Sequence, residues 1–305
     1  MADRWECIVV GGGAAGLSAA LVLGRARRRT LLVDAGEPSN RVAEGMGGVL
    51  GHDRRAPEEL YAAGRAELEA YPSVELRPGR VVGGAARDDV FELELEDGSR
   101  EVARAVLLAT GMDYHPPDVD GVAERWGRSV FHCPFCHGWE VRDRPLGVLD
   151  ASARAAERAL LLRLWSDDVT LYTNGAAGLE AGDAARLDRA GVSVEERTVD
   201  GLRGPGDQLE AVVLAEGAER RCEALLVPAA MRQRSELARQ LGARVADPDS
   251  PATEALEMDP LFRTTVPRLY AAGDVGAHAM PSVTSAIAAG SAAAKTIVFD
   301  LLTEA

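Results

Sequence analysis

Two cysteines separated by two residues, Cys133 and Cys136, are the residues of this chain whose types and spacing most directly suggest chemistry. Such a pair can close and reopen an intramolecular disulfide, which stores and releases two electrons. The same spacing also supplies half of a zinc site. The remaining cysteines, Cys7 and Cys222, are far away in the sequence and do not form a second pair. The spacing therefore favours a redox function, while it leaves a zinc site open.

Histidines flank the pair at His132 and His137. An adjacent imidazole can stabilise a thiolate or move the proton that thiol–disulfide exchange requires, and it titrates near neutral pH. We expect His137 to be the catalytic base that works with Cys133 and Cys136. The alternative for His137 is a solvated residue at the start of a helix, and a purely structural role for His132 is equally compatible with the sequence.

The N-terminal stretch carries a glycine-rich turn in the arrangement that binds dinucleotides. Residues 7–10 are an apolar run typical of a buried parallel strand, and residues 17–23 favour a helix. In the Gly-x-Gly-x-x-Gly turn between them, Gly11 allows a tight turn and Gly13 lets a pyrophosphate approach the backbone. Gly16 lets the helix pack closely on the strand.

The ligand of this turn is expected to lie at the helix N-terminus, beside Ala14 and Ala15, where free N–H groups favour phosphates. A second strand at residues 30–33 leads into Asp34. A carboxylate at this position typically holds the hydroxyls of a ribose. The motif therefore stands in the full context that dinucleotide binding requires.

Four further segments extend the predicted cofactor site. The glycine-rich loop 35–53 is long enough to be functional. The strand around 106–108 ends in a small turn, and the strand around 268–272 ends in Gly-Asp, which places a carboxylate at the ligand edge of a sheet. The helix 282–302 could direct its N-terminus at a reduced cofactor ring, although it could also be simply a core helix. The candidate residues in these segments are Ala35, Asn40, Ala109, Thr110, Gly111, Gly273, Asp274, Ser282 and Val283.

Length and composition bound the function. The 305 residues predict two domains, and the formal net charge of −14 argues against nucleic acid and anionic membranes as partners. No uninterrupted apolar run reaches the roughly 18 residues of a membrane span. The N-terminus lacks the pattern of a secretory signal and there are only four cysteines. These features predict a cytoplasmic redox protein.

The middle of the chain repeats the order of elements at its beginning. After consecutive prolines at 116–117, which suggest a hinge, residues 146–149 predict a strand, 153–165 a helix and 169–172 a second strand. The fold class expected is α/β, with two Rossmann-like domains that are doubly wound, three-layer and of the dinucleotide-binding type.

Taken in order, the first glycine turn, Ala-Thr-Gly at 109–111, Cys-Pro-Phe-Cys at 133–136 and Tyr-Ala-Ala-Gly-Asp at 270–274 resemble the low-molecular-weight thioredoxin reductase family over nearly the whole chain. The resemblance implies an FAD-binding domain from residues 1–114 and 232–305. An NAD(P)H-type domain, residues 115–231, is inserted between these two parts and carries the cysteines. FAD as the cofactor and a homodimer are implied as well.

The resemblance also implies roles for individual residues. Cys136 is the thiol nearest the flavin, and Cys133 exchanges with the substrate. Asp274 contacts the ribityl or phosphate region of FAD, and Asp34 contacts the adenosine ribose.

Two departures from the family concern the inserted domain. Where the reductases have a Gly-x-Gly-x-x-Ala turn, residues 150–155 contain no glycine, and Asp150 would set a carboxylate against a pyrophosphate. The family's basic His-Arg-Arg cluster is replaced by Thr173, Asn174 and Gly175. Together these changes predict that the domain has kept its fold and lost its nucleotide.

A third departure is His137, which stands where the reductases usually have an aspartate. With Cys-Pro-Phe-Cys-His-Gly-Trp-Glu, this resembles the dithiol oxidase branch, which closes a disulfide in holomycin- or gliotoxin-type dithiols. That resemblance implies that electrons run from a small-molecule dithiol through the cysteine pair and FAD to O2, giving H2O2. Two alternatives stay open: an NAD(P)H-dependent disulfide reductase, and a flavin-binding redox sensor without turnover.

Several neighbours of these motifs are expected to be structural. We interpret Phe135 and Trp139 as packing residues, Phe135 also shielding the disulfide, and Cys7 and Cys222 as inert. His278 follows the Gly-Asp motif, and its position is equally compatible with a flavin contact and with an ordinary loop.

Overall fold

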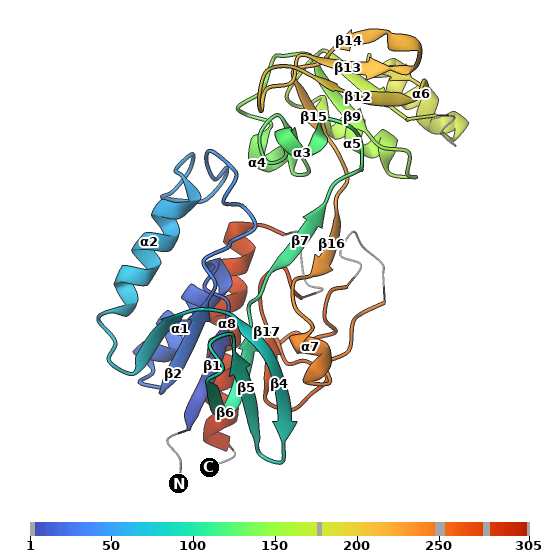
Figure 1. Ribbon diagram of the computed structural model, residues 1–305. Coiled ribbons are helices and arrows are strands. Elements are labelled where there is room, and N and C mark those ends of the chain that lie inside the picture. Colours follow the sequence, from blue (N-terminus) through green and yellow to red (C-terminus); the bar gives the residue numbers. More distant parts are fainter. Residues whose placement is uncertain (1–3, 176–178, 248–253, 277–280, 304–305) are drawn as a thin grey trace. The chain divides into compact units, whose positions relative to one another are not determined.

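The computed structural model describes residues 4–175, 179–247, 254–276 and 281–303, which form two compact units (Figure 1). Unit 1 consists of Met1–Arg41, Val49–Tyr114 and Met231–Ala305, and unit 2 consists of Val42–Gly48 and His115–Ala230. Most of unit 2 is therefore one continuous insertion into the chain of unit 1. Unit 2 also includes a short segment of the glycine-rich loop, which nothing in the sequence pattern marks off from its neighbours.

Unit 1 is built on a seven-stranded sheet. Strands β3, β2, β1 and β6 are parallel neighbours in that order. The far edge of β6 is divided, because β5 pairs with its first part in antiparallel fashion and β17 pairs with its last part in parallel. The strands are β1 (Trp5–Val10), β2 (Thr30–Asp34), β3 (Val74–Pro78), β4 (Val81–Arg87), β5 (Val90–Leu95), β6 (Arg100–Leu108) and β17 (Leu269–Ala271).

The central strand β1 shows why this sheet is covered on both faces. Ile8 and Val10 face one hydrophobic core, while Cys7 and Val9 face another, as the two-residue period of a strand requires. The second core is closed by the helices α1 (Ala14–Arg25), α2 (Pro57–Leu68) and α8 (Val283–Thr303). The first core is closed by the β4–β5 hairpin, α7 (Leu237–Gln240) and the segment that precedes β17.

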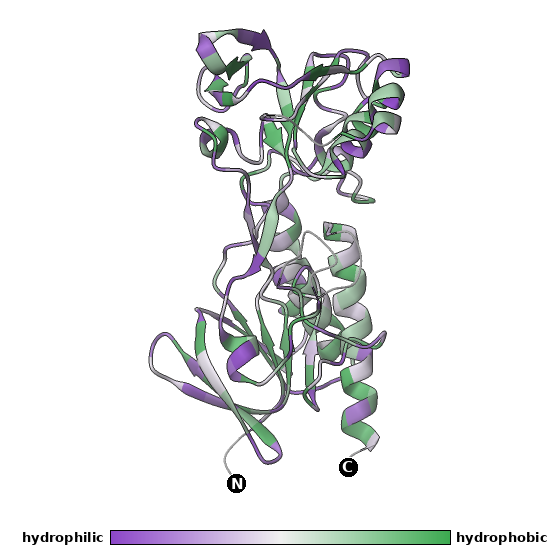
Figure 2. Ribbon diagram, turned by 90° about the vertical axis from the view of Figure 1, so that its right-hand side faces the viewer, coloured by the Kyte–Doolittle hydropathy of each residue, from purple (hydrophilic) through white to green (hydrophobic). Residues whose placement is uncertain are grey.

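Helix α8 is long and apolar enough to cross a membrane by length and composition alone. A count of uninterrupted apolar residues misses it because Lys295 and Asp300 interrupt the run, and Figure 2 shows purple bands along an otherwise pale to green helix. Core helices of soluble proteins meet the same criterion. Gly290 supports that interpretation, because a Cβ there would lie 2.0 Å from the carbonyl oxygen of Ala15 in α1.

Unit 2 has a five-stranded parallel sheet in the order β11-β10-β9-β15-β8. Two of its helices, α5 and α6, cover one face, and a separate three-stranded antiparallel sheet covers the other together with α3. The parallel sheet consists of β8 (Val130–Phe131), β9 (Leu146–Leu149), β10 (Val169–Tyr172), β11 (Ser193–Glu195) and β15 (Ala224–Leu226). The antiparallel sheet consists of β12 (Val199–Arg203), β13 (Ala211–Leu214) and β14 (Glu219–Arg221). The helices are α3 (Val122–Arg125), α4 (Pro134–His137), α5 (Ala155–Leu162), α6 (Ala181–Arg189) and the 3-10 turn Ala215–Gly217.

Strands β7 (Met112–His115) and β16 (Ala230–Gln233) pair with each other where the chain leaves and re-enters unit 1. The expected fold class, two α/β domains of the dinucleotide-binding type with parallel sheets, is confirmed.

Candidate functional site

The first glycine turn is built so tightly that only one of its motif positions faces open space. Gly11 has φ +104°, and a Cβ there would lie 2.4 Å from the carbonyl oxygen of Ala109. A Cβ on Gly16 would lie 1.8 Å from the carbonyl oxygen of Gly11, whereas a Cβ on Gly13 would meet nothing within 4 Å. The backbone at Gly13 is therefore open to a ligand at the N-terminus of α1, where Ala14 and Ala15 begin the helix.

Asp34 lies directly over this turn. Its Oδ1 accepts hydrogen bonds from the backbone N–H groups of Gly12 and Gly36, each at 3.0 Å. Its Oδ2 makes no hydrogen bond to a described residue, so it remains available to a ligand hydroxyl. A Cβ on Gly12 would lie 2.3 Å from the Asp34 Cγ, so Gly12 is needed for this contact although it stands outside the motif.

Asn40 is held by a tyrosine that the sequence did not single out. Tyr61 of α2 donates its hydroxyl to Asn40 Oδ1 at 2.8 Å, and burial raises the pKa of Tyr61 to about 12, so the hydroxyl stays a donor. The Asn40 amide nitrogen is thereby left to donate elsewhere. Ala35, immediately after Asp34, is exposed.

Two turns at the carboxyl edge of the same sheet carry the remaining candidates. Ala109, Thr110 and Gly111 follow β6, where Gly111 has φ +67°. Gly273 and Asp274 follow β17, and Gly273 has φ +82°. Because β6 and β17 are adjacent parallel strands, both turns lie at one edge of the sheet.

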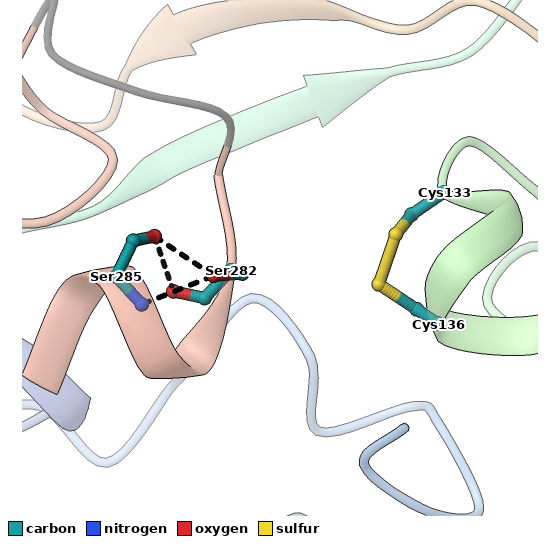
Figure 3. The surroundings of a disulfide bond; sticks show 4 residues. All are labelled: Cys133, Cys136, Ser282 and Ser285. Carbon is teal, nitrogen blue, oxygen red and sulfur yellow. Dashed lines mark hydrogen bonds between the residues drawn. A yellow bond between two sulfur atoms is a disulfide. The ribbon is translucent and has the colours of Figure 1, made fainter. Parts of the chain in front are cut away.

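The N-terminus of α8 is capped by its own serines (Figure 3). The backbone N–H of Ser285 donates to Ser282 Oγ at 3.0 Å, and the two hydroxyl oxygens are 2.8 Å apart. The Ser282 hydroxyl is thus used within the helix cap, and Val283 is the first residue of the helix. His278 lies outside the described residues.

In unit 2, Cys133 and Cys136 form a disulfide with their Cα atoms 5.3 Å apart (Figure 3). Cys136 lies in the single-turn helix α4, and its N–H donates to the Cys133 carbonyl at 3.2 Å. Among the described residues, no three His, Cys, Asp or Glu side chains converge as a metal site. The two cysteines are therefore present in their oxidised, disulfide form.

Glycines bring two other segments into contact with this helix. A Cβ on Gly47 would lie 2.6 Å from the Cys136 carbonyl oxygen, so the segment Val42–Gly48 lies directly on the backbone of Cys136. A Cβ on Gly138 would lie 2.7 Å from the ring of Trp165. Neither contact is evident from the sequence, because each joins segments that are distant along the chain.

The two aromatic residues beside the disulfide are exposed, so the expectation that they are packing residues is wrong for most of their surface. Phe135 is 60% exposed and meets only the edge of Trp165, at 5.5 Å between ring centroids. Trp139 is 57% exposed and carries the Arg142 guanidinium over its ring at 4.1 Å. Phe135 lies in the single-turn helix α4 and Trp139 in the turn that follows it.

His137 is not a solvated residue at a helix start. It ends α4, its ring stacks on Phe131 at 5.2 Å, and neither ring nitrogen has a hydrogen-bond partner among the described residues. Burial lowers the pKa of His137, against the opposing influence of the Cys133 and Gly127 backbone. The imidazole is therefore neutral near pH 7 and able to accept a proton.

His132 stacks on Trp126 at 5.6 Å, and burial lowers its pKa to about 4, with His137 contributing in the same direction. Cys7 and Cys222 are buried, and burial raises the pKa of each thiol to about 12. Both thiols stay protonated at neutral pH, which keeps them poor nucleophiles.

The turn after β9 contains an internal ion pair. The Asp150 side chain is only 2% exposed, its Oδ1 accepts the Ser152 N–H at 2.8 Å, and its Oδ2 pairs with the Arg158 guanidinium of α5. Helix α5 begins only at Ala155. The carboxylate that the sequence predicts to repel a phosphate is thus already neutralised by an arginine that sequence reasoning did not identify.

The turn after β10 is also satisfied internally. The Thr173 hydroxyl donates to the Gly175 carbonyl at 2.6 Å, and Asn174, with φ 53°, accepts the Val199 N–H at 2.8 Å. Residues 173–175 offer no cation to a phosphate.

Comparison with known proteins agrees with this geometry. The family model described as "Pyridine nucleotide-disulphide oxidoreductase" matches residues 5–290. "Thioredoxin reductase tcpT" of Claviceps purpurea (strain 20.1) is 30% identical, over 98% of this chain and 95% of its own. "Thioredoxin reductase aclD" of Aspergillus oryzae is also 30% identical, over 98% and 97% of the two chains.

Solved structures give the same result. An oxidoreductase from Agrobacterium tumefaciens is 37% identical with a TM-score of 0.93, and covers 99% of this chain and 100% of its own. The structure titled "Crystal structure of HlmI" is 39% identical with a TM-score of 0.89, and covers 100% of this chain and 94% of its own. The chain therefore belongs to the pyridine nucleotide-disulphide oxidoreductase family and is a thioredoxin reductase-like disulfide oxidoreductase.

Proposed function

We propose that this protein is an FAD-dependent dithiol oxidase that closes an intramolecular disulfide in a small-molecule dithiol and uses O2 as the terminal acceptor, giving H2O2. The observation that carries the proposal is the Asp150–Arg158 pair in unit 2. A reductase of this family needs a nucleotide phosphate at that turn. Here the buried Asp150 carboxylate accepts the Ser152 N–H and pairs with the Arg158 guanidinium, so neither this donor nor this cation is left for a phosphate.

The residues of unit 1 fit FAD. The backbone at Gly13 is open where a pyrophosphate would approach, and Asp34 keeps one carboxylate oxygen available for a ribose hydroxyl. Asn40 and Asp274 each have a polar atom without a hydrogen-bond partner among the described residues, namely the amide nitrogen of Asn40 and Oδ1 of Asp274. We assign the pyrophosphate of FAD to the turn from Gly11 to Gly16. We assign the rest of the cofactor to the residues Ala35, Asn40, Ala109, Thr110, Gly111, Gly273, Asp274, Ser282 and Val283. When bound, FAD would take two electrons from the reduced cysteine pair and pass them to oxygen.

The chemistry at the cysteines balances as thiol–disulfide exchange. A substrate thiolate attacks Sγ of Cys133 and breaks its bond to Cys136. The second substrate thiolate then attacks the substrate sulfur of the mixed disulfide, so the cyclic disulfide leaves and both cysteines are reduced. We assign to His137 the acceptance of a proton from an attacking thiol, because its imidazole is neutral and neither ring nitrogen has a hydrogen-bond partner among the described residues.

Family resemblance further supports a cytoplasmic homodimer. Light scattering after size exclusion tests the dimer, since a monomer at micromolar concentration would contradict it.

An anaerobic experiment separates the oxidase from an NAD(P)H-dependent reductase, the function that the names of the relatives suggest. The yellow enzyme is mixed with excess NADPH and, separately, with dithiothreitol. We expect the flavin absorbance to bleach with the dithiol only and H2O2 to form when air is readmitted. Rapid bleaching by NADPH would refute the oxidase proposal and favour the reductase.

A further inference from the structure

The Asp274 carboxylate of unit 1 accepts a hydrogen bond from Tyr114, a residue of strand β7, which belongs to no dinucleotide-binding motif. The Tyr114 hydroxyl donates to Asp274 Oδ2 at 2.9 Å. Tyr114 lies in β7 and Asp274 follows β17, so the contact joins segments 160 residues apart in the sequence. Oδ1 of Asp274 makes no hydrogen bond to a described residue.

We propose that Tyr114 is a positioning residue for the cofactor: its hydroxyl fixes the Asp274 carboxylate so that Oδ1 faces the ligand as an ionised acceptor. This inference rests on the FAD binding proposed above. A tyrosine can serve in this way only as long as it keeps its proton. Burial raises the pKa of Tyr114, and the neighbouring negative charge of Asp274 raises it further, so the hydroxyl donates throughout the physiological range.

The surroundings of Asp274 make this hydrogen bond important for its charge state. Burial raises the pKa of Asp274, while the Tyr114 hydrogen bond and the positive charge of Arg234 lower it. Arg234 is itself held by Asp113, with Nε 2.7 Å from Oδ1, and by the Glu37 carbonyl. The other titratable group that faces Asp274 from the described residues is Tyr61 of α2.

Removing the hydroxyl therefore has two consequences with a definite sign. The carboxylate loses its fixed orientation, which weakens a ligand hydrogen bond at every pH. Its pKa also rises further, so protonation removes the acceptor at a higher pH than in the wild type. FAD retention should thus be lost earlier as the pH falls.

The test is titration of FAD-stripped protein with FAD, followed by flavin fluorescence between about pH 5 and pH 8. For Tyr114→Phe we expect affinity about tenfold weaker at neutral pH, the loss of one charge-assisted hydrogen bond, and an upward shift in the pH midpoint of binding. Tyr71→Phe is the matched control, since its hydroxyl accepts only from Arg25 on the surface of unit 1 and should change neither value.

A double substitution keeps the proposal testable if Tyr114→Phe also lowers stability. In an Asp274→Asn background the pH midpoint disappears, and adding Tyr114→Phe should weaken FAD binding less than about twofold further. Equal affinity and an unshifted midpoint in Tyr114→Phe would overturn the role of Tyr114 alone. A wild-type chain that binds no FAD would overturn the proposed function as well.

Discussion

The ion pair in the turn after β9 gives the sharpest quantitative prediction, which is the cost of Arg158→Ala. This change leaves the Asp150 carboxylate, 2% exposed, without its cation. Removing one partner of a fully buried pair costs about 3–5 kcal/mol. Arg158 is 20% exposed and the Ser152 N–H still binds Asp150, so we place the loss just below that range, at about 2–3 kcal/mol.

Asp150→Asn serves as the contrasting variant. It keeps an oxygen for the Ser152 N–H and removes the buried charge, while Arg158 can turn its guanidinium towards water. We expect this variant to lose only about 1 kcal/mol. Arg186→Ala is the matched surface control, because its pair with Asp183 joins neighbouring turns of the exposed helix α6 and contributes about 0.5 kcal/mol or less.

Urea unfolding followed by tryptophan fluorescence, which reports unit 2 through Trp165, measures all three variants. The free energy of unfolding should decrease in the order wild type, Arg186→Ala, Asp150→Asn, Arg158→Ala. If Arg158→Ala loses no more stability than Arg186→Ala, the Asp150 carboxylate is not held as a buried ion pair in this turn. The argument against a nucleotide phosphate at that position would then be refuted.

Three further predictions concern the disulfide helix α4 and the residues beside it. Gly47→Ala inserts a Cβ 2.6 Å from the Cys136 carbonyl oxygen and should lower the free energy of unfolding in urea by about 1–3 kcal/mol. Gly182→Ala, where nothing lies within 4 Å, should not lower it, and equal losses in the two variants would contradict the packing argument. Cys136→Ser should keep FAD bound but abolish dithiol-dependent bleaching of the flavin, and unchanged turnover would exclude the disulfide as the electron carrier. Because the folded-state pKa of His132 is lowered to about 4, the free energy of unfolding should fall as the pH drops from about 6.5 to 4. His132→Phe, which retains the stacking on Trp126, should reduce this dependence on pH, and a dependence equal to that of the wild type would contradict the prediction.

The sequence predicts the buried parallel strands well and the antiparallel ones poorly. Strands expected at 146–149 and 169–172 are Leu146–Leu149 and Val169–Tyr172, because a strand covered on both faces is a continuous apolar run. Strand β4, Val81–Arg87, forms no such run, because it contains glycines and its end is exposed. The strand expected at 106–108 begins at Arg100, where it pairs with β5.

Candidate site residues that lie in local motifs can be read from the sequence, while their supporting contacts cannot. Gly11, Gly13 and Gly16 belong to one short turn, so their spacing alone indicates that the turn is tight, although the contact between Gly11 and the Ala109 carbonyl appears only in the fold. Tyr114 and Gly47 act on residues that only the fold brings near, and a tyrosine or glycine without a motif carries no local signal.

The turn at Asp150 shows how the proposed loss of a nucleotide site would leave the surrounding fold intact. The N-terminus of a helix after a buried strand presents unsatisfied N–H groups and a positive dipole, which in a nucleotide-binding domain are met by phosphate. If the ligand is no longer bound, these N–H groups remain, and leaving them without a hydrogen-bond partner in a buried turn costs free energy. Asp150 accepts the Ser152 N–H in the turn before α5, and Arg158 balances its charge from within α5. Restoring glycines to residues 151–153 would therefore not by itself restore a phosphate site, because the carboxylate would still hold the N–H of residue 152 and the Arg158 guanidinium; the substitution of Asp150 has to come first.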